Sequence, residues 1–368
     1  MGGFKRKIFY LSGFDPRGAR FYHQLHAEQA ALYAQRSDRE IVVGDRKRSA
    51  DGNNGWTIED RTAGAGGELL FLGWDDVIRR YWIRNPARLL WGALASTLAF
   101  TLAMDWRHGR TFPKGSLIAF YYPALSTVIL PILLVAALWL LAGPLVGIVA
   151  GLGLTALVVR SVKSLWMLRF IIFNDRLSSD NPDPLIEARL DSMANAIAAA
   201  LDDVHDEVLF VTHSNGAVLA VPLMARLLER HGGQMPESFA LMTLGSCIPL
   251  VGCRKDALRF RAQLETVAKG EFLWLDVGSL TDGASIPLVD PCISCATTHR
   301  PTLHILSPRW FRYSDPATYH ARRRNKYEVH FEYLRALDRG SPLDYLRVTS
   351  CGEPLAGSIA AFKAENDL

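Results

Sequence analysis

The sequence of 368 residues predicts an α/β fold, in which a mostly parallel sheet carries helices on both faces and is interrupted by a helical transmembrane insert. Short β-rich runs alternate with helical segments on both flanks of the chain, which is typical of a parallel sheet. Between these flanks, residues 89–159 hold long apolar stretches. We therefore expect one α/β domain built from residues 1–80 and 176–368, split by a membrane insert at residues 81–175.

The flank before the insert begins with a predicted strand, turn and helix. The turn at 12–18 contains Gly and Pro, and the stretch 51–67, rich in Gly and Asp, predicts a loop. The expected regular elements are a strand at 7–11, a helix at 19–34, and short strands at 40–43 and 68–72.

Three apolar stretches make up the insert: 89–104, 117–141 and 145–159. A span needs roughly 20 apolar residues, and the number of crossings must be even because both flanks belong to one domain. The loop between the first two stretches carries three basic residues, whereas the turn at 142–144 is uncharged, and basic loops stay cytoplasmic. We therefore expect a spanning hairpin at about 117–160. The segment 89–104 would be re-entrant or interfacial, although its apolar character would also suit a span.

The flank after the insert alternates regularly between helix and strand, as a parallel sheet requires. The expected helices are 183–201, 216–230 and a final helix at 326–337, and the expected strands are 207–211, 239–244, 271–277 and 302–306.

The junction between the strand at 207–211 and the helix at 216–230 carries a serine, Ser214, in the run Val208-Leu-Phe-Val-Thr-His-Ser-Asn-Gly-Ala-Val218. A nucleophile elbow is such a turn, and it needs small flanking residues because the two backbones approach closely. Gly216 meets that need, whereas Thr212 stands where the G-x-S-x-G pattern has its first glycine. The alternative is that Ser214 is only the N-cap of the helix.

These residues, with the early Ser12-Gly13-Phe14 turn, resemble the α/β-hydrolase superfamily, and the resemblance covers both flanks of the insert. In that superfamily, two backbone N–H groups form the oxyanion hole: one follows the nucleophile, and one lies in the loop after an early strand. The resemblance therefore implies Asn215 and Phe14 as the oxyanion-hole residues.

The order serine, acid, histidine in this superfamily implies the other two triad members. Asp282 is favoured as the acid because it lies in the loop after a predicted strand, and Asp276, within that strand, is the alternative. The base must come later in the chain. His330 is favoured because it lies beside the predicted final helix, and His320 is second; the other downstream histidines are His299 and His304.

The expected function is that of a serine esterase of the lipase-like class, which cleaves an ester or thioester through an acyl-enzyme intermediate. The expected substrate has a long acyl chain and is delivered from the bilayer. Acyl transfer to another acceptor would use the same residues. The rival expectation is a non-catalytic α/β-hydrolase-like membrane protein that acts as a binding or assembly partner. No cofactor or metal is expected, because Cys292 and Cys295 lack a second ligand pair at zinc spacing.

Charge and cysteine content indicate the compartment. The net charge is +4, with basic residues scattered or beside the apolar stretches, which favours membrane lipid as a partner and gives little support to nucleic acid. Five cysteines, after an N-terminus that begins with a strand-like segment, predict reduced thiols. We expect a multi-pass protein of the bacterial inner membrane with its catalytic domain in the cytoplasm, and 89–104 could support homo-oligomers.

Overall fold

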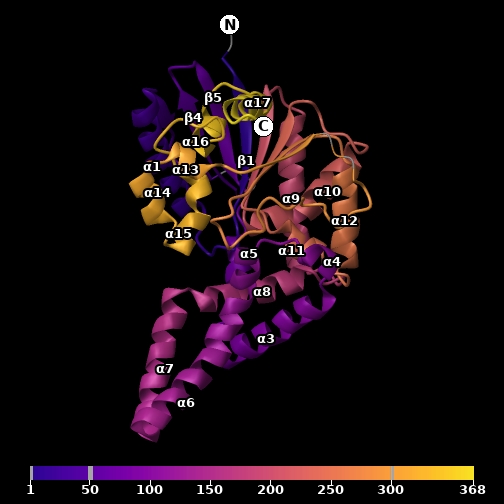
Figure 1. The fold of residues 1–368 in the computed structure, drawn as a ribbon. Helices are drawn as coiled ribbons and strands as arrows, with labels where there is room; N and C mark the ends of the chain where they lie inside the picture. Colours follow the sequence, from indigo (N-terminus) through magenta and orange to yellow (C-terminus); the bar gives the residue numbers. More distant parts are fainter. Residues whose placement is uncertain (1–2, 49–52, 299, 301) are drawn as a thin grey trace.

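The computed structural model describes residues 3–48, 53–298, 300 and 302–368. It is an α/β structure with one mixed, mostly parallel sheet, in the order β2-β4-β5-β1-β6-β7-β8-β9, and β3 pairs with β4 (Figure 1). The strands are β1 Lys5–Leu11, β2 Ile41–Val43, β3 Lys47–Arg48, β4 Asn54–Asp60, β5 Ala65–Phe71, β6 Glu207–His213, β7 Phe239–Leu244, β8 Leu273–Val277 and β9 Leu303–Leu306.

Alternation along the central strands divides the core into two layers, one on each face of the sheet. Phe9 and Leu11 of β1 belong to one layer, and Ile8 and Tyr10 to the other, because successive side chains point to opposite faces. The first layer is covered by α9 Pro184–Leu201, α10 Asn215–Arg230, α11 Ile248–Gly252 and α12 Leu258–Lys269. The second lies under α1 Ala19–Ser37 and the C-terminal helices α13 Trp310–Tyr313, α14 Pro316–Arg322, α15 Lys326–His330, α16 Tyr345–Ser350 and α17 Leu355–Glu365.

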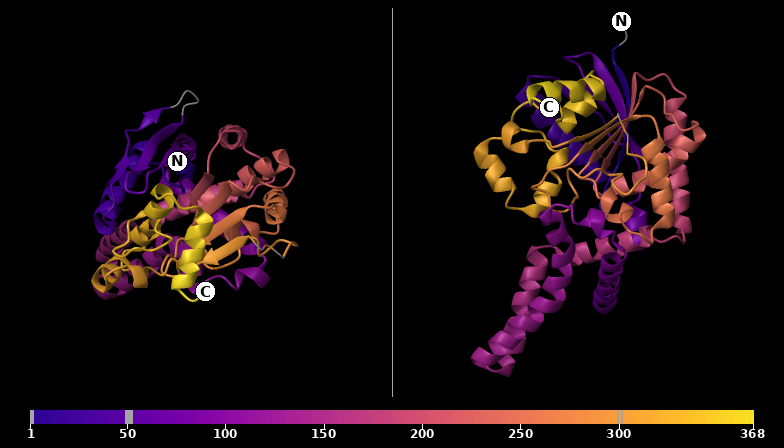
Figure 2. Two further views of the ribbon diagram at one scale, coloured as in Figure 1. Left: turned by 90° about the horizontal axis from the view of Figure 1, so that it is seen from above. Right: turned by 45° about the vertical axis from the view of Figure 1, so that its right-hand side comes forward.

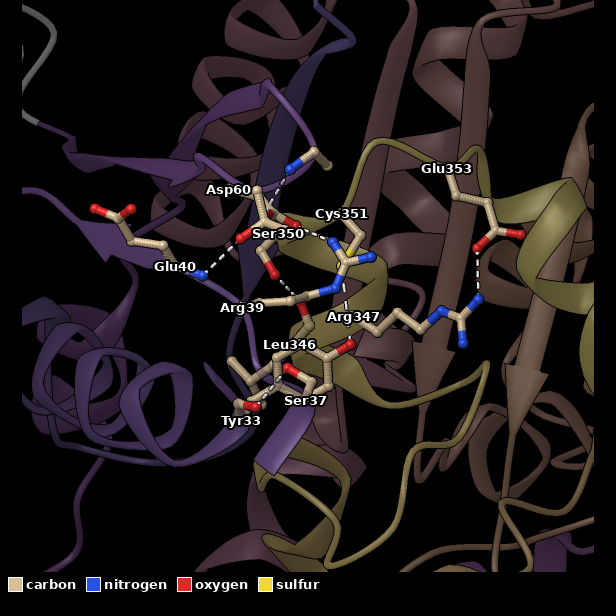
Figure 3. A network of polar contacts seen from close by, with 12 residues as sticks. Tyr33, Ser37, Arg39, Glu40, Asp60, Leu346, Arg347, Ser350, Cys351 and Glu353 are labelled. Carbon is tan, nitrogen blue, oxygen red and sulfur yellow. Dashed lines mark hydrogen bonds and ion pairs between the residues drawn. The ribbon is translucent and has the colours of Figure 1, made fainter. Parts of the chain in front are cut away.

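Strands from both flanks of the insert share this sheet, because β1 pairs in parallel with both β5 and β6. A buried ion pair of 2.6 Å between Arg6 and Glu207 supports the pairing, and Arg6 also donates to the carbonyl of Cys351. A second buried group, Asp60, accepts from Arg39 where β4 and α1 meet α16 (Figure 3). The N-terminal, central and C-terminal parts of the chain therefore form one folded unit.

Two expectations about secondary structure were wrong. The stretch 51–67 is not all loop, since β4 occupies Asn54–Asp60, with Trp56 and Ile58 buried and Thr57 between them exposed; residues 51 and 52 lie outside the described residues. That alternation is the strand signal, and the glycines around it obscured it.

The expected final helix at 326–337 breaks after His330 into the 3-10 turn η2 Glu332–Leu334, and α16 and α17 follow. The break coincides with two tertiary hydrogen bonds. The His330 carbonyl accepts from His213, and the Tyr333 hydroxyl donates to Asp282, so long-range contacts override the local helical pattern here.

The insert projects from one end of the sheet, as Figures 1 and 2 show. Helix α2 Asp75–Arg80 leads into it from the domain. The helices that follow are α3 Pro86–Ala103, α4 Trp106–Gly109, α5 Lys114–Ala124, the π-helical η1 Leu125–Ile129, α6 Leu130–Ala142, α7 Pro144–Ser161 and α8 Ser164–Leu177. Among the described residues, two helices are long and apolar enough to cross a membrane by length and composition: the continuous helix Lys114–Ala142 and Pro144–Ser161. α3 is not one of them.

Helices α6 and α7 form a hairpin that extends away from the α/β domain (Figures 1 and 2). The two helices touch through small residues of α7, because a methyl group at Gly147 or Gly151 would come within 2.6 to 2.8 Å of the α6 backbone. The outer faces expose large apolar side chains, among them Leu140 and Leu145 at 88% and 76%. An exposed apolar surface of this kind is typical of a membrane or protein contact.

Candidate active site

Ser214 lies between β6 and α10, at the carboxyl edge of the parallel strands. Its backbone has φ 57° and ψ −123°, and a positive φ costs a non-glycine residue about 1–3 kcal/mol. The hydroxyl makes no capping hydrogen bond to α10, so the structure does not support the N-cap role that the sequence left open. Strain at a strand-to-helix turn, with an uncapped hydroxyl, is the geometry of a nucleophile elbow.

Two glycines allow other backbone to approach this serine. A methyl group at Gly216 would collide with the carbonyl oxygens of Leu11 and Ser12, at the end of β1. A methyl group at Gly13 would lie 2.7 Å from Ser214 Cβ and 3.2 Å from its Oγ. The turn after β1 therefore lies directly against the serine, a contact that the sequence implied only by analogy.

The expected oxyanion-hole residues, Phe14 and Asn215, lie on either side of this contact. Neither backbone N–H donates a hydrogen bond to another described residue, so both donors are available to a bound oxygen. The Phe14 side chain is buried, and its ring centroid lies 5.0 Å from that of Phe173 in α8 and 5.8 Å from that of Trp82. The insert thus packs onto the loop that carries one of the two donors.

In the described part of the chain, buried side-chain polar atoms without a hydrogen-bond partner occur on neighbours of Ser214 in the chain, on the turn that lies against it, and on His330. Buried polar groups are usually paired, so such atoms are candidates for contact with a ligand or solvent. The atoms are Ser12 Oγ, Thr212 Oγ1, His213 Nδ1, the amide oxygen and nitrogen of the Asn215 side chain, and His330 Nε2.

His330 and Asp282 are joined across 48 residues of sequence by a hydrogen bond of 3.0 Å from Nδ1 to Oδ2, and both side chains are buried. Burial would raise the pKa of Asp282, but the neighbouring His330 and the hydrogen bonds to the carboxylate outweigh it, and the pKa of Asp282 is lowered. An ionised Asp282 fixes the proton of His330 on Nδ1 and leaves Nε2 as an acceptor. No hydrogen bond joins Ser214 to His330 Nε2; in many enzymes this contact tightens only when substrate binds.

Two further residues hold this pair in place. Tyr333 Oη donates to Asp282 Oδ2 at 3.2 Å and accepts from the Ser279 N–H at 2.9 Å. His213 Nε2 donates to the His330 carbonyl at 2.8 Å, and its ring lies 4.8 Å from the His330 ring. Burial lowers the pKa of His213 to about 3, so its ring is neutral. Sequence reasoning missed the Tyr333 contact, because no local pattern relates Tyr333 to a carboxylate 51 residues earlier.

The alternative candidates lie elsewhere. Asp276 is buried within β8 and accepts from Thr243 Oγ1 at 2.5 Å, and it makes no hydrogen bond to a described histidine. Burial raises the pKa of Asp276 to about 7. His320 is exposed on α14, and the ring of His304 contacts Lys363. His299 lies outside the described residues.

No group of three or more metal-ligating side chains is found in residues 3–48, 53–298, 300 and 302–368. The side chains of Ser214, His330 and Asp282 and the backbone donors beside them are groups of the kinds that acyl transfer uses.

The insert is also fastened to the loop that carries Asp282. Ser116, in the first turn of α5, donates to the Ser285 carbonyl at 2.6 Å. A methyl group at Gly283 would lie 3.3 Å from the Gly115 carbonyl oxygen. The insert consequently contacts both sides of the site, at Phe14 through α8 and at the Asp282 loop through α5.

Comparison with protein-family models, with curated proteins and with solved structures finds no match to this chain. Its function is therefore inferred from the residues themselves.

Proposed function

We propose that this chain is a membrane-anchored serine hydrolase of the α/β-hydrolase type, which cleaves an ester or thioester of a lipid or long-chain acyl compound. The observation that carries the proposal is the conjunction of a strained serine at the β6–α10 turn with a buried His330–Asp282 pair. Strand order supports it: the serine follows β6, the acid follows β8 two strands along, and the histidine follows β9.

In the proposed reaction, His330 Nε2 accepts the Ser214 proton as Oγ attacks the acyl carbon. The Phe14 and Asn215 N–H groups then bind the developing oxyanion, each worth roughly 3 kcal/mol in the transition state. Asp282 stabilises the imidazolium, which returns its proton to the leaving alcohol or thiol, and water attacks the acyl-enzyme in the same way.

The test is labelling by a short alkyl fluorophosphonate of the purified full chain in detergent. We expect wild type to be labelled, Ser214→Ala and His330→Ala to lose labelling, and His320→Ala, the matched histidine control, to keep it. No labelling of a folded wild type would favour the non-catalytic partner role, in which the same fold binds without turnover. Loss in Ser214→Ala alone would assign the base to another histidine.

We further propose that the α6–α7 hairpin crosses the bilayer and that the α/β domain lies in the cytoplasm. Residues 125–142 and 144–161 each extend about 27 Å as helix, close to the roughly 30 Å hydrocarbon core. Basic residues lie only at the domain end of the hairpin, at Arg160 and Lys163, and the far turn is uncharged.

Cysteine labelling in intact spheroplasts tests this topology. A membrane-impermeant maleimide added from outside should modify Ala142→Cys at the far turn and leave Ser161→Cys unmodified until the cells are lysed. Equal protection of both positions would mean that the hairpin ends within the bilayer, and modification of Ser161→Cys alone would mean that the domain faces outward.

A further inference from the structure

A cavity lies where the insert meets the α/β domain, on the side of the Asp282 loop. Its volume is about 40 Å³, and on this scale roughly 10–15 Å³ holds one water-sized group. The insert contributes apolar side chains, and the domain contributes the segments after β7 and after Asp282. The lining includes Phe100, Leu117, Phe120, Met167, Leu250 and Ile286.

The polar side chains of the lining are already paired with other protein atoms. Trp106 Nε1 donates to the Thr101 carbonyl at 3.0 Å, Tyr121 Oη is paired with Thr101 Oγ1, and Ser116 donates to Ser285. Cys247 Sγ likewise donates to the Ala284 carbonyl at 3.3 Å. An acceptor group of a polar ligand would therefore find no free side-chain donor in this lining, and its desolvation would go uncompensated. An apolar occupant is the one that this lining suits.

The cavity adjoins the proposed catalytic groups through two short segments of backbone. Ser214 N–H donates to the Leu244 carbonyl at 2.8 Å, and Cys247, three residues further on, lines the cavity. Gly283, next to Asp282, lines it too. Phe170 completes the connection, because it lines the cavity and its ring lies 6.3 Å from that of Phe14.

We infer that this cavity receives the alkyl chain of the acyl group, an inference that rests on the proposed function. Its size matches the first few carbons of a chain. The rest of a long chain stays among the apolar surfaces of α3 and α5, where Leu98, Leu102 and Ile118 are exposed at 58%, 74% and 66%. The substrate class is therefore a medium- or long-chain acyl ester or thioester that remains partly in the bilayer while it reacts.

Chain-length selectivity tests the inference. Ala119 lines the cavity, and its Cβ lies opposite Gly283, 3.6 Å from where a methyl group there would be. Ala119→Leu should fill the cavity and lower kcat/KM for p-nitrophenyl octanoate at least about tenfold relative to the acetate ester, with acetate hydrolysis within about twofold of wild type. Ala95→Leu, the same change at an exposed position of α3, is the matched control and should alter neither.

Leu250→Ala provides a second variant in case Ala119→Leu fails to fold, and it should enlarge the cavity and shift the preference toward longer chains. The cavity assignment would be overturned if both Leu250→Ala and Ala119→Leu hydrolyse the acetate ester and keep the wild-type ratio of kcat/KM for octanoate to kcat/KM for acetate. That result would leave the proposed function standing. The absence of both ester hydrolysis and fluorophosphonate labelling in folded wild type would remove the proposed function and this inference together.

Discussion

Replacing Asp282 by Asn examines the proposed triad at the residue whose surroundings the structure defines best. Three donors point at its carboxylate: His330 Nδ1 at 3.0 Å, Tyr333 Oη at 3.2 Å and the Ala284 N–H at 3.0 Å. A carboxylate accepts all three, but an amide has only one oxygen. In either orientation of the substituted side chain, an amide N–H would face a donor.

The two orientations have different costs. If the amide nitrogen faces Ala284, a buried donor loses its acceptor, at about 1–3 kcal/mol of stability. If it faces His330, the imidazole avoids the loss by carrying its proton on Nε2, an adjustment that the Ala284 N–H cannot make, so we expect this orientation. In that tautomer, His330 cannot accept a proton from Ser214. Loss of the correct tautomer lowers kcat about 10⁴-fold in serine proteases, so we expect a decrease of roughly 10³- to 10⁴-fold, or about 4–5.5 kcal/mol in the barrier.

The assay is p-nitrophenyl ester hydrolysis together with the rate of fluorophosphonate labelling, with thermal unfolding in detergent to show that the variant is folded. Asp276→Asn is the matched control, because Asp276 is equally buried but bonds to Thr243 and to no described histidine, and we expect its activity to stay within a few-fold of wild type. A folded Asp282→Asn variant with activity within tenfold of wild type would refute the triad.

Three further outcomes follow from the contacts described above. The pKa of Asp276 is about 7 in the folded protein against about 4 in the unfolded chain. The protonated carboxyl therefore stabilises the fold fully below about pH 4, and this stabilisation, about 4 kcal/mol, is lost as pH rises through about 7. Asp276→Asn should remove this decline, measured as the free energy of unfolding against pH. Tyr333→Phe should lower kcat about tenfold with little change in KM, because it removes the hydrogen bond to Asp282 and leaves the Ser279 N–H unpaired. An unchanged kcat would assign Tyr333 a packing role only. Gly147→Leu should destabilise the hairpin by about 1–3 kcal/mol. The control is Gly153→Leu, because nothing lies within 4 Å of a methyl group added at Gly153, and its Tm should be higher. Equal Tm values would contradict the α6–α7 packing.

Local patterns were sufficient for much of the architecture. The fully buried runs of β6 and β7 and the helical periodicity between them predicted a mostly parallel α/β fold, which the structure confirms. The two candidate spans, Lys114–Ala142 and Pro144–Ser161, also follow the apolar stretches of the sequence. Composition and period act over a few neighbouring residues, so they can be read directly from the chain.

The site was predictable only in part. Ser214 could be singled out because strand, serine and helix are contiguous in sequence. The sequence could not decide between Asp276 and Asp282 as firmly, since both lie near the end of one strand, and the contact of Asp282 with His330 is what distinguishes them. The hydrogen bond between Asp282 and His330 spans 48 residues, beyond the reach of any local pattern.

The sequence by itself therefore determined the fold class, the position of the apolar insert and the serine at the turn, because each depends on residues close together in the chain. The tertiary structure alone decided that β4 completes the sheet, that Tyr333 and His213 form hydrogen bonds with Asp282 and His330, and that α5 and α8 of the insert pack on both sides of the candidate site. These features depend on long-range contacts, whose partners are chosen by the packing of the whole domain.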